Sequence, residues 1–352
     1  MESPLWTDEH APALAELPQR EVRESLTRAV EEPMNLVVFG PRGAGKTAAV
    51  RALAQEAHDD PDNDFLELNL ADFFQRTKKE IRNDPRFAPF LSGEISWVKQ
   101  LGTGQKQQVS KRYKSDWSKA EMVNHVLKEY AAYRPTASPY KTILLDNAEA
   151  IREDFQQALR RVMERHYETT QFVIATRQPS KLIPPIESRC FPVPVRAPSH
   201  AEAVEVLERI VEREGVDHDD DGIEYVAGYG DGDLRKAILG AQTAYEDEGA
   251  VTMQAAYEAL GDVGIRDELE AILEDADAGE FADARKGLDE LLYDRGYAGE
   301  EVLGELLEAA RARYDGDDLA RFHLLAAEID REMHEGTTDR VHLGRLVAEL
   351  GR

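Results

Sequence analysis

Eight residues near the N-terminus have the types and spacing of a phosphate-binding loop. Residues 40–47 read G-P-R-G-A-G-K-T, which fits the pattern G-x-x-x-x-G-K-[S/T]. The glycines allow backbone N–H groups to turn towards an anion, and the lysine can reach β- and γ-phosphate oxygens. A turn that merely joins two elements is the alternative, and the full spacing argues against it. We expect a nucleotide to contact Gly40, Pro41, Arg42, Gly43, Ala44, Gly45, Lys46 and Thr47.

Strands and a helix must hold this loop in place. Residues 36–39 are apolar and β-branched, which predicts a buried strand, and residues 48–57 have the composition of a helix. A second apolar run, 142–146, predicts a strand that ends at Asp146. In phosphate-loop ATPases an aspartate in this position holds Mg²⁺, so Thr47 and Asp146 are the expected metal ligands.

The residue after this aspartate is Asn147. Phosphate-loop ATPases usually carry here the glutamate that activates the attacking water. An amide can orient water but cannot accept its proton, so Asn147 occupies a degenerate catalytic-base position and hydrolysis at this site should be slow. Glu149 lies two residues further on and would have to reach back to replace the missing base.

The composition is strongly acidic. The 352 residues carry a formal net charge of -26, and 30 of the 43 basic residues are arginine. Screening at high salt weakens self-repulsion, so we interpret this charge as adaptation to a halophilic cytoplasm; ordinary acidic solubility is the alternative. The one cysteine, Cys190, excludes an intramolecular disulfide and a zinc cluster of several thiolates. No signal peptide or membrane span is recognisable, which predicts a cytoplasmic protein without a membrane partner.

A basic insertion interrupts this acidic chain. Residues 75–119 contain 11 Lys or Arg against 4 Asp or Glu, with aromatic residues between them. Such a segment suits contacts to a phosphate backbone or a single strand, but a solvated insertion with locally packed aromatics is an equal alternative. A predicted helix over 154–166 adds grouped arginines. The candidate DNA contacts are Lys111, Arg112, Arg160 and Arg161.

The C-terminal half is predicted to be almost entirely helical. A stretch with prolines at 192, 194 and 198 is interpreted as a hinge. Helical patterns then cover about 200–214, 220–229, 233–247 and 252–261, and five more cover roughly 266–276, 280–293, 297–313, 317–334 and 338–350. Near the N-terminus, Trp6 is either a core plug or an aromatic wall beside a bound base, and we favour the plug.

The motifs, in this order, resemble those of replication factor C small subunits, the archaeal-type clamp loaders of the AAA+ ATPases. The similarity covers most of the chain. Residues 4–6 (PLW) match the family's opening box, and residues 157–164 (QALRRVME) match the helix after the Mg²⁺ strand. Residues 180–190 (SKLIPPIESRC) end in the family's Ser-Arg-Cys, and residues 232–238 (GDLRKAI) match its lid segment.

The resemblance implies an α/β fold in three parts. These are an AAA+ P-loop parallel-sheet domain (1–197, with the insertion 75–119), an α-helical lid (198–263) and an α-helical C-terminal collar (264–352). It implies that Arg189 reaches a neighbouring subunit's ATP site as an arginine finger and that Arg235 touches the γ-phosphate. Thr176 would occupy the first sensor position.

The resemblance also implies a function with several partners. A clamp loader uses ATP and Mg²⁺ to open a sliding clamp and place it on primed DNA. The implied partners are a large clamp-loader subunit, another small subunit, a PCNA-type sliding clamp and primer–template DNA.

Departures from the family pattern gather around the nucleotide site. Residues 8–12 read DEHAP where the family usually has EKYRP, Asn147 replaces the catalytic glutamate, and Thr176 stands where an asparagine is usual. We therefore interpret the chain as a specialised second small subunit that binds ATP but hydrolyses it poorly. An autonomous AAA+ remodelling motor is one alternative, which Asn147 argues against. A scaffold that never binds nucleotide is another, and the intact phosphate loop argues against it.

Overall fold

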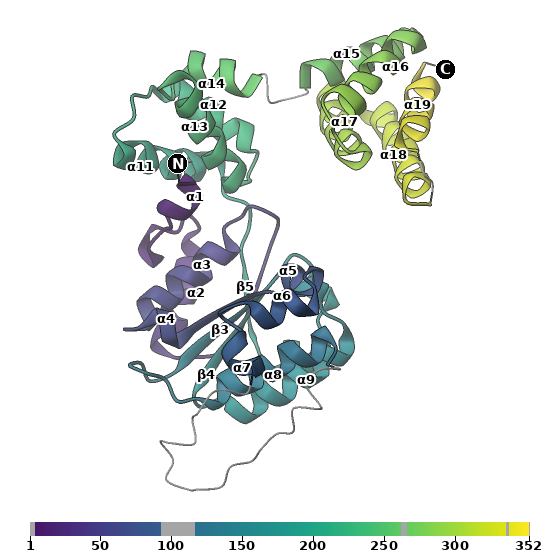
Figure 1. The fold of residues 1–352 in the computed structure, drawn as a ribbon. Helices are drawn as coiled ribbons and strands as arrows, with labels where there is room; N and C mark the ends of the chain where they lie inside the picture. The colour runs from purple at the N-terminus through teal and green to yellow at the C-terminus, as the bar shows by residue number, and fades with distance from the viewer. Residues whose placement is uncertain (1–3, 93–116, 262–265, 336–337, 352) are drawn as a thin grey trace, which may run out of the picture. The chain divides into compact units, whose positions relative to one another are not determined.

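The chain forms two compact units in a computed structural model that describes residues 4–92, 117–261, 266–335 and 338–351 (Figure 1). The first unit, Met1–Ala255, contains a β-sheet with helices, and the second, Ala256–Arg352, is helical in its described part. The division into three domains at 197 and 263 stays a prediction.

A parallel five-stranded sheet forms the centre of the first unit. The strands lie in the order β2-β3-β4-β1-β5. They are β1 Leu36–Phe39, β2 Phe65–Asn69, β3 Lys141–Asp146, β4 Thr170–Thr176 and β5 Phe191–Pro194. Strands β3 and β4 are buried along their whole length, as expected for a parallel sheet covered on both faces. The predicted α/β fold class is confirmed.

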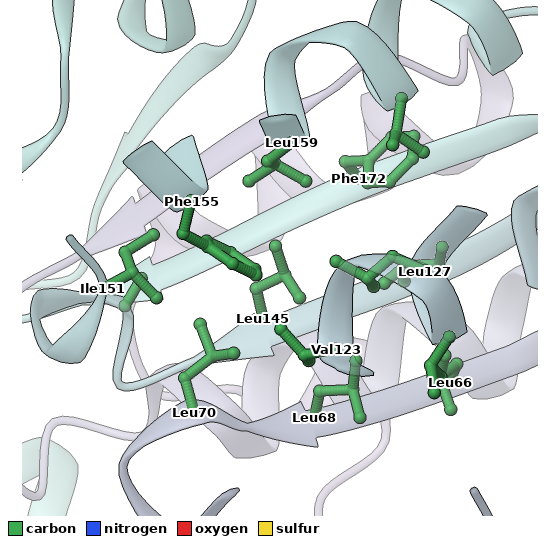
Figure 2. Close-up of a cluster of buried hydrophobic side chains, with 14 of the residues drawn as sticks. Leu66, Leu68, Leu70, Val123, Leu127, Leu145, Ile151, Phe155, Leu159 and Phe172 are labelled. Atoms are coloured by element: carbon green, nitrogen blue, oxygen red, sulfur yellow. The ribbon is translucent and has the colours of Figure 1, made fainter. Parts of the chain in front are cut away.

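Helices cover both faces of this sheet. They include α2 Arg20–Glu31, α3 Lys46–Ala57, α4 Pro61–Asp64, α5 Leu70–Gln75, α6 Lys78–Asn83, α7 Ala88–Ser92, α8 Lys119–Ala132, α9 Glu153–His166 and α10 Pro184–Glu187. Side chains alternate across a strand, so the neighbours Leu144 and Leu145 face different cores. Leu145 shares one core with Phe155 of α9 (Figure 2), whereas Leu144 shares the other with Leu53 of α3.

The stretch predicted as a proline-studded hinge contains the fifth strand. Strand β5 pairs in parallel with β1, with Phe191 opposite Leu36 and Pro194 opposite Phe39. Proline cannot donate to a strand ladder and is tolerated on edge strands, and β5 lies at the edge of the sheet. The hinge prediction is therefore wrong for residues 191–194.

A group of helices follows the sheet. Its members are α11 His200–Glu214, α12 Asp220–Gly230, α13 Leu234–Glu248 and α14 Met253–Gly261. The four helices predicted between 200 and 261 are confirmed to within one residue at each end. A capping box fixes the start of α11, because the N–H of Ser199 donates to the Glu202 carboxylate and the N–H of Glu202 donates back to the Ser199 hydroxyl.

The N-terminal segment docks on this helical group. Within α1 Trp6–Glu9, the Trp6 side chain is buried and stacks on Tyr245 of α13, with ring centroids 5.7 Å apart. The N–H of Trp6 donates to Oε1 of Gln242 at 2.9 Å. The interpretation of Trp6 as a core plug is confirmed.

The second unit packs its helices around a core of leucine, alanine and valine side chains. These helices are α15 Arg266–Asp277, α16 Phe281–Asp289, α17 Gly299–Arg313, α18 Gly316–Glu335 and α19 Asp339–Leu350. The pattern predicted over 280–293 comprises α16 and a π-helical turn, Glu290–Asp294. The five predicted helices of this region are confirmed.

Only the two ends of the basic insertion 75–119 lie within the described residues. There, Phe87 is buried in the core that contains Leu145 and Phe155, and Phe90 and Trp117 pack against the same core. Local packing therefore accounts for these three aromatic side chains. Trp97, Tyr113, Lys111 and Arg112 lie outside the described residues.

Among the helices of the described ranges, none combines the length and the apolar character that a bilayer span requires.

A buried lysine makes the stability of this fold depend on pH. The ammonium of Lys141 donates to the Tyr130 carbonyl and lies 4.5 Å from the Tyr130 ring centroid. Burial lowers the pKa of Lys141 to about 8, against the attraction of Asp64. Because the unfolded lysine titrates near pH 10.4, the unfolded chain binds more protons above pH 8, and the free energy of unfolding rises with pH there.

Replacing this lysine by methionine should remove that contribution. We expect the stability of Lys141→Met relative to the wild-type protein to fall by about 2–3 kcal/mol between pH 7 and pH 10, since only the wild type gains from deprotonation. Urea unfolding at several pH values measures this difference, in which the other titrating groups cancel. A difference that does not vary with pH would show that Lys141 has an ordinary pKa.

Candidate functional site

The phosphate-binding loop connects β1 to α3, as the sequence predicts. Gly45 is the N-cap of α3 and has φ 90°, a left-handed conformation that glycine adopts without strain. The first N–H groups of α3 have no partner within the helix, and the helix dipole adds positive potential at the same end. This end of α3 can therefore bind a phosphate.

The helical group lies directly against the loop. The N–H of Leu234, the first residue of α13, donates to the Gly43 carbonyl at 3.1 Å. Gly43 has φ 69°, in the left-handed region, and a Cβ there would lie 1.9 Å from a carboxylate oxygen of Asp233, so any other residue would strain the loop and displace that side chain. Arg235 follows on the exposed side of α13, one residue from the contact. Pro41 and Arg42 lie on the exposed side of the loop.

The two predicted metal ligands meet at the carboxyl end of β3. The Thr47 hydroxyl donates to Oδ2 of Asp146 at 2.9 Å, and the Asn147 N–H donates to Oδ1 at 2.9 Å. Burial raises the pKa of Asp146, although both hydrogen bonds oppose the shift. A hydroxyl beside a carboxylate offers the hard oxygen ligands that Mg²⁺ prefers. Thr47 and Asp146 therefore fit the metal of Mg-ATP.

The loop lysine lies beside these ligands. Its ammonium donates to the Pro41 carbonyl at 2.6 Å. Burial lowers the pKa of Lys46, and the charges of Asp146 and Glu149 oppose this shift. The positive charge of Lys46 is therefore partly desolvated and lies near the carboxylates of the site. A bound phosphate would neutralise this charge.

The carboxylate that would have to replace the missing base, that of Glu149, is already engaged in hydrogen bonds. Glu149 accepts the Thr176 hydroxyl at 2.9 Å, and from Arg177 it accepts the N–H at 3.2 Å and Nε at 2.7 Å. Burial alone would raise the pKa of Glu149, but these hydrogen bonds hold it at about 2. A carboxylate this acidic is a poor general base at neutral pH. Sequence reasoning did not identify Arg177 as the residue that holds Glu149.

Asn147 itself adopts a left-handed conformation, with φ 53°. Asparagine tolerates this region better than most residues, because its short side chain can bond locally. The position at the end of β3 is therefore shaped for a tight turn, and its side chain carries no group that can accept a proton.

Arg189 lies at the other end of the sheet from the chain's own phosphate loop. It precedes β5, which starts opposite Leu36 at the beginning of β1, whereas the loop follows the end of β1 at Phe39. Its Nη2 lies 2.7 Å from Oε1 of Glu164, and its Nη1 donates to the Pro185 carbonyl at 2.7 Å. With this placement Arg189 cannot serve the nucleotide site of its own chain.

Two of the four DNA-contact candidates, Arg160 and Arg161, lie within the described residues, and both are on α9. Nε of Arg160 is 3.4 Å from the Glu164 carboxylate that also holds Arg189, and Arg161 is exposed. Their role in DNA binding stays a prediction. In the described part of the chain no cluster of three or more His, Cys, Asp or Glu side chains could hold a further metal ion.

Two protein families match the sequence of this chain. Residues 36–195 match the family described as "ATPase family associated with various cellular activities (AAA)", and residues 266–349 match the "Replication factor C C-terminal domain". Together the two matches span the sheet with its nucleotide loop and the second helical unit.

Two relatives that match over nearly the whole chain have the same name. The replication factor C small subunit of Halobacterium salinarum is 29% identical over 98% of this chain and 95% of its own length. That of Methanococcus maripaludis is 29% identical over 98% of both chains. The Thermotoga maritima RuvB Holliday junction branch migration motor has a TM-score of 0.47 and 15% identity, over 73% of this chain and 75% of its own. By the two family matches and these whole-length relatives, the chain matches the replication factor C small subunits of the AAA+ ATPase family from its nucleotide loop to its last helices.

Proposed function

We propose that this chain binds Mg-ATP as a subunit of a clamp-loader complex, and that the nucleotide acts here as an assembly ligand more than as a fuel. The loop backbone and Lys46 would hold the phosphates, Thr47 and Asp146 the metal, and Arg235 the γ-phosphate. When bound, Mg²⁺ neutralises phosphate charge. The complex would open a PCNA-type sliding clamp and place it on primer–template DNA, with a large subunit and another small subunit as partners.

The proposal rests on one observation: neither residue that could activate an attacking water is able to act as a general base. Asn147 cannot accept a proton, and Glu149, with its pKa of about 2, is tied to Thr176 and Arg177. The site thus keeps the groups that could bind Mg-ATP but lacks the general base that would activate water. This combination favours a subunit whose ATP persists over an autonomous motor, and the retained binding groups argue against a scaffold that never binds nucleotide.

Arg189 supports a role between subunits. It lies remote from its own nucleotide loop and at the surface, where a neighbouring subunit can approach. A guanidinium stabilises charge that develops on a transferring phosphoryl group, so Arg189 would act at the neighbour's site. Arg160 and Arg161 are the candidates for contacts to the DNA backbone, and the acidic surface is consistent with a salt-rich cytoplasm.

Restoring the missing base should restore hydrolysis. We expect Asn147→Glu to raise ATP turnover in the assembled complex by at least about tenfold, since a positioned general base contributes about 10²–10⁴-fold. Asn147→Gln is the matched control, because it has the same length and the same cost in the left-handed conformation but no base. Steady-state phosphate release measures all three proteins. Fast turnover by the isolated wild-type chain would contradict the proposal and favour the motor.

Removing the proposed finger should affect the neighbour's site. Arg189→Ala should leave this chain's own ATP affinity unchanged and lower turnover at the adjacent subunit by about 10³-fold or more, the range known for fingers supplied in trans. ATPase assays of the reconstituted complex measure this effect.

The alternative is that Arg189 only forms an ion pair with Glu164. Both side chains are more than a third exposed, so the pair should contribute less than about 1 kcal/mol to stability. Glu164→Gln breaks the same pair and keeps the arginine. Equal loss of turnover in Arg189→Ala and Glu164→Gln would refute the finger.

A further inference from the structure

A phosphate-binding loop leaves its own carbonyl groups in need of partners. When the N–H groups of such a loop point at an anion, the carbonyls of the same peptides point away from it. If they are buried, each needs a donor from outside the loop, because an unpaired buried polar group is costly. The Gly43 carbonyl accepts the Leu234 N–H of α13. The next residue, Ala44, is fully buried, and its carbonyl has a different donor.

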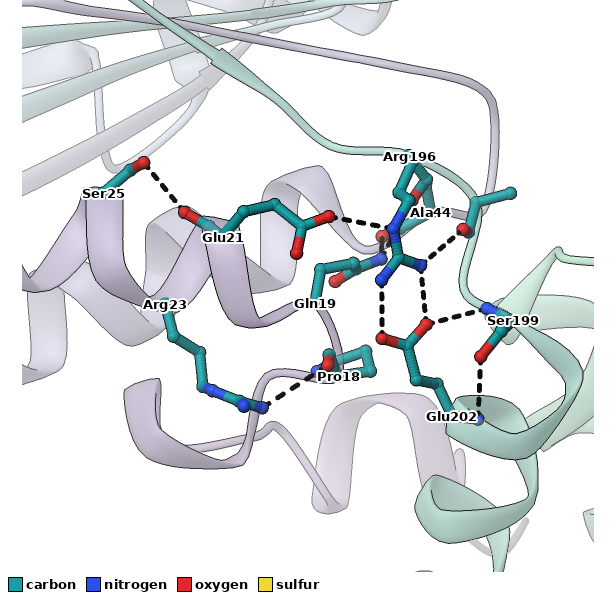
Figure 3. Close-up of polar contacts among 10 residues, drawn as sticks. Pro18, Gln19, Glu21, Arg23, Ser25, Ala44, Arg196, Ser199 and Glu202 are labelled. Atoms are coloured by element: carbon teal, nitrogen blue, oxygen red, sulfur yellow. Dashed lines mark hydrogen bonds and ion pairs between the residues drawn. The ribbon is translucent and has the colours of Figure 1, made fainter.

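That donor is the side-chain amide of Gln19, the N-cap residue of α2. Its Nε2 donates to the Ala44 carbonyl at 3.1 Å and to the Arg196 carbonyl at 2.9 Å (Figure 3). Gln19 is only 2% exposed, so water does not replace either contact readily. Both hydrogens of the amide are thus used to join the phosphate loop to the segment between β5 and α11.

Arg196, at the second of these contacts, is held from two sides. Its Nε donates to Glu21 of α2 at 2.8 Å, and its Nη1 and Nη2 donate to the Glu202 carboxylate of α11 at 2.6 and 2.7 Å (Figure 3). The Arg196 hydrogen bonds hold the pKa of Glu202 at about 2, against its burial. Because Glu202 also caps α11, the position of this helix is tied to the backbone that Gln19 contacts.

We propose that Gln19 is a positioning residue for nucleotide binding, which sets the orientation of the Ala44 peptide and couples the phosphate loop to the connection leading into α11. The inference rests on the proposed function, since it takes the loop to bind ATP. Gln19 would not touch the nucleotide. It acts through the loop, and any displacement of α11 and Arg196 would be transmitted to the loop through the same amide.

A second buried glutamine provides a matched control for a purely structural role. Gln171 of β4 is also 2% exposed, and its Nε2 also donates to two backbone carbonyls, those of Ala29 and Met34, at 3.2 and 3.0 Å. It lies near the start of β4, whereas the phosphate loop follows the far end of the sheet. The two glutamines therefore have similar burial, and each amide donates to two backbone carbonyls; Gln171 also accepts the Thr142 hydroxyl at 3.0 Å. They differ in the backbone that they hold in place, because only Gln19 contacts the phosphate loop.

The experiment compares Gln19→Leu and Gln171→Leu in the full chain. Gln19→Leu removes two hydrogen bonds of a buried amide and Gln171→Leu removes three, so both should lower the melting temperature. Only Gln19→Leu should weaken binding of a fluorescent ATP analogue with Mg²⁺, by about ten- to hundredfold, the effect expected from leaving a buried carbonyl unpaired. Lys46→Ala removes the phosphate-binding cation, so it shows the signal expected when the chain no longer binds the ATP analogue.

A second measurement does not require nucleotide. Amide hydrogen exchange over residues 40–47 should be faster in Gln19→Leu than in the wild-type and Gln171→Leu proteins. Unchanged affinity and exchange in Gln19→Leu would overturn the inference, as would an equal loss of affinity in both leucine variants. A wild-type chain that binds no ATP would defeat the proposed function, and the exchange measurement would still decide whether Gln19 positions the loop.

Discussion

A loop that binds phosphate through its backbone has to turn its N–H groups inward, and the rest of the first unit supplies what this orientation demands. The strand and helix on either side fix the ends of the loop, with Gly45 in the left-handed conformation. The outward carbonyls of Gly43 and Ala44 accept donors from α13 and from Gln19. The loop therefore forms one continuous hydrogen-bonded structure with the helices that follow the sheet.

Charge at the site is arranged for binding more than for proton transfer. Buried Asp146 keeps its oxygens beside Thr47, where a metal ion can use them. Glu149 would be the natural substitute for the missing base, but its hydrogen bonds to Thr176 and Arg177 stabilise the carboxylate at the expense of its basicity. The two acidic groups, close together in sequence, thus have opposite pKa shifts, because hydrogen bonds together outweigh desolvation at Glu149 but not at Asp146.

Patterns that depend on local chemistry were predictable from the sequence. The strand at 36–39, the helix at 200–214 and the phosphate loop follow from apolar runs, helical periodicity and glycine spacing, and the structure confirms them. Strand β5 was missed because its prolines suggest a break, and only its place at the sheet edge makes them acceptable. The roles of Gln19 and Arg177 depend on contacts between residues distant in the chain, which no local pattern encodes.

ATP should stay intact at this site while the chain is alone. The most direct measurement incubates the isolated chain with Mg²⁺ and ATP, removes free nucleotide, and identifies what remains bound after acid release. With Asn147 unable to accept a proton and Glu149 tied to its partners, the bound nucleotide should still be ATP after many hours. If the bound nucleotide is instead recovered as ADP within minutes, in an amount that rises in proportion to the protein concentration, the account is contradicted.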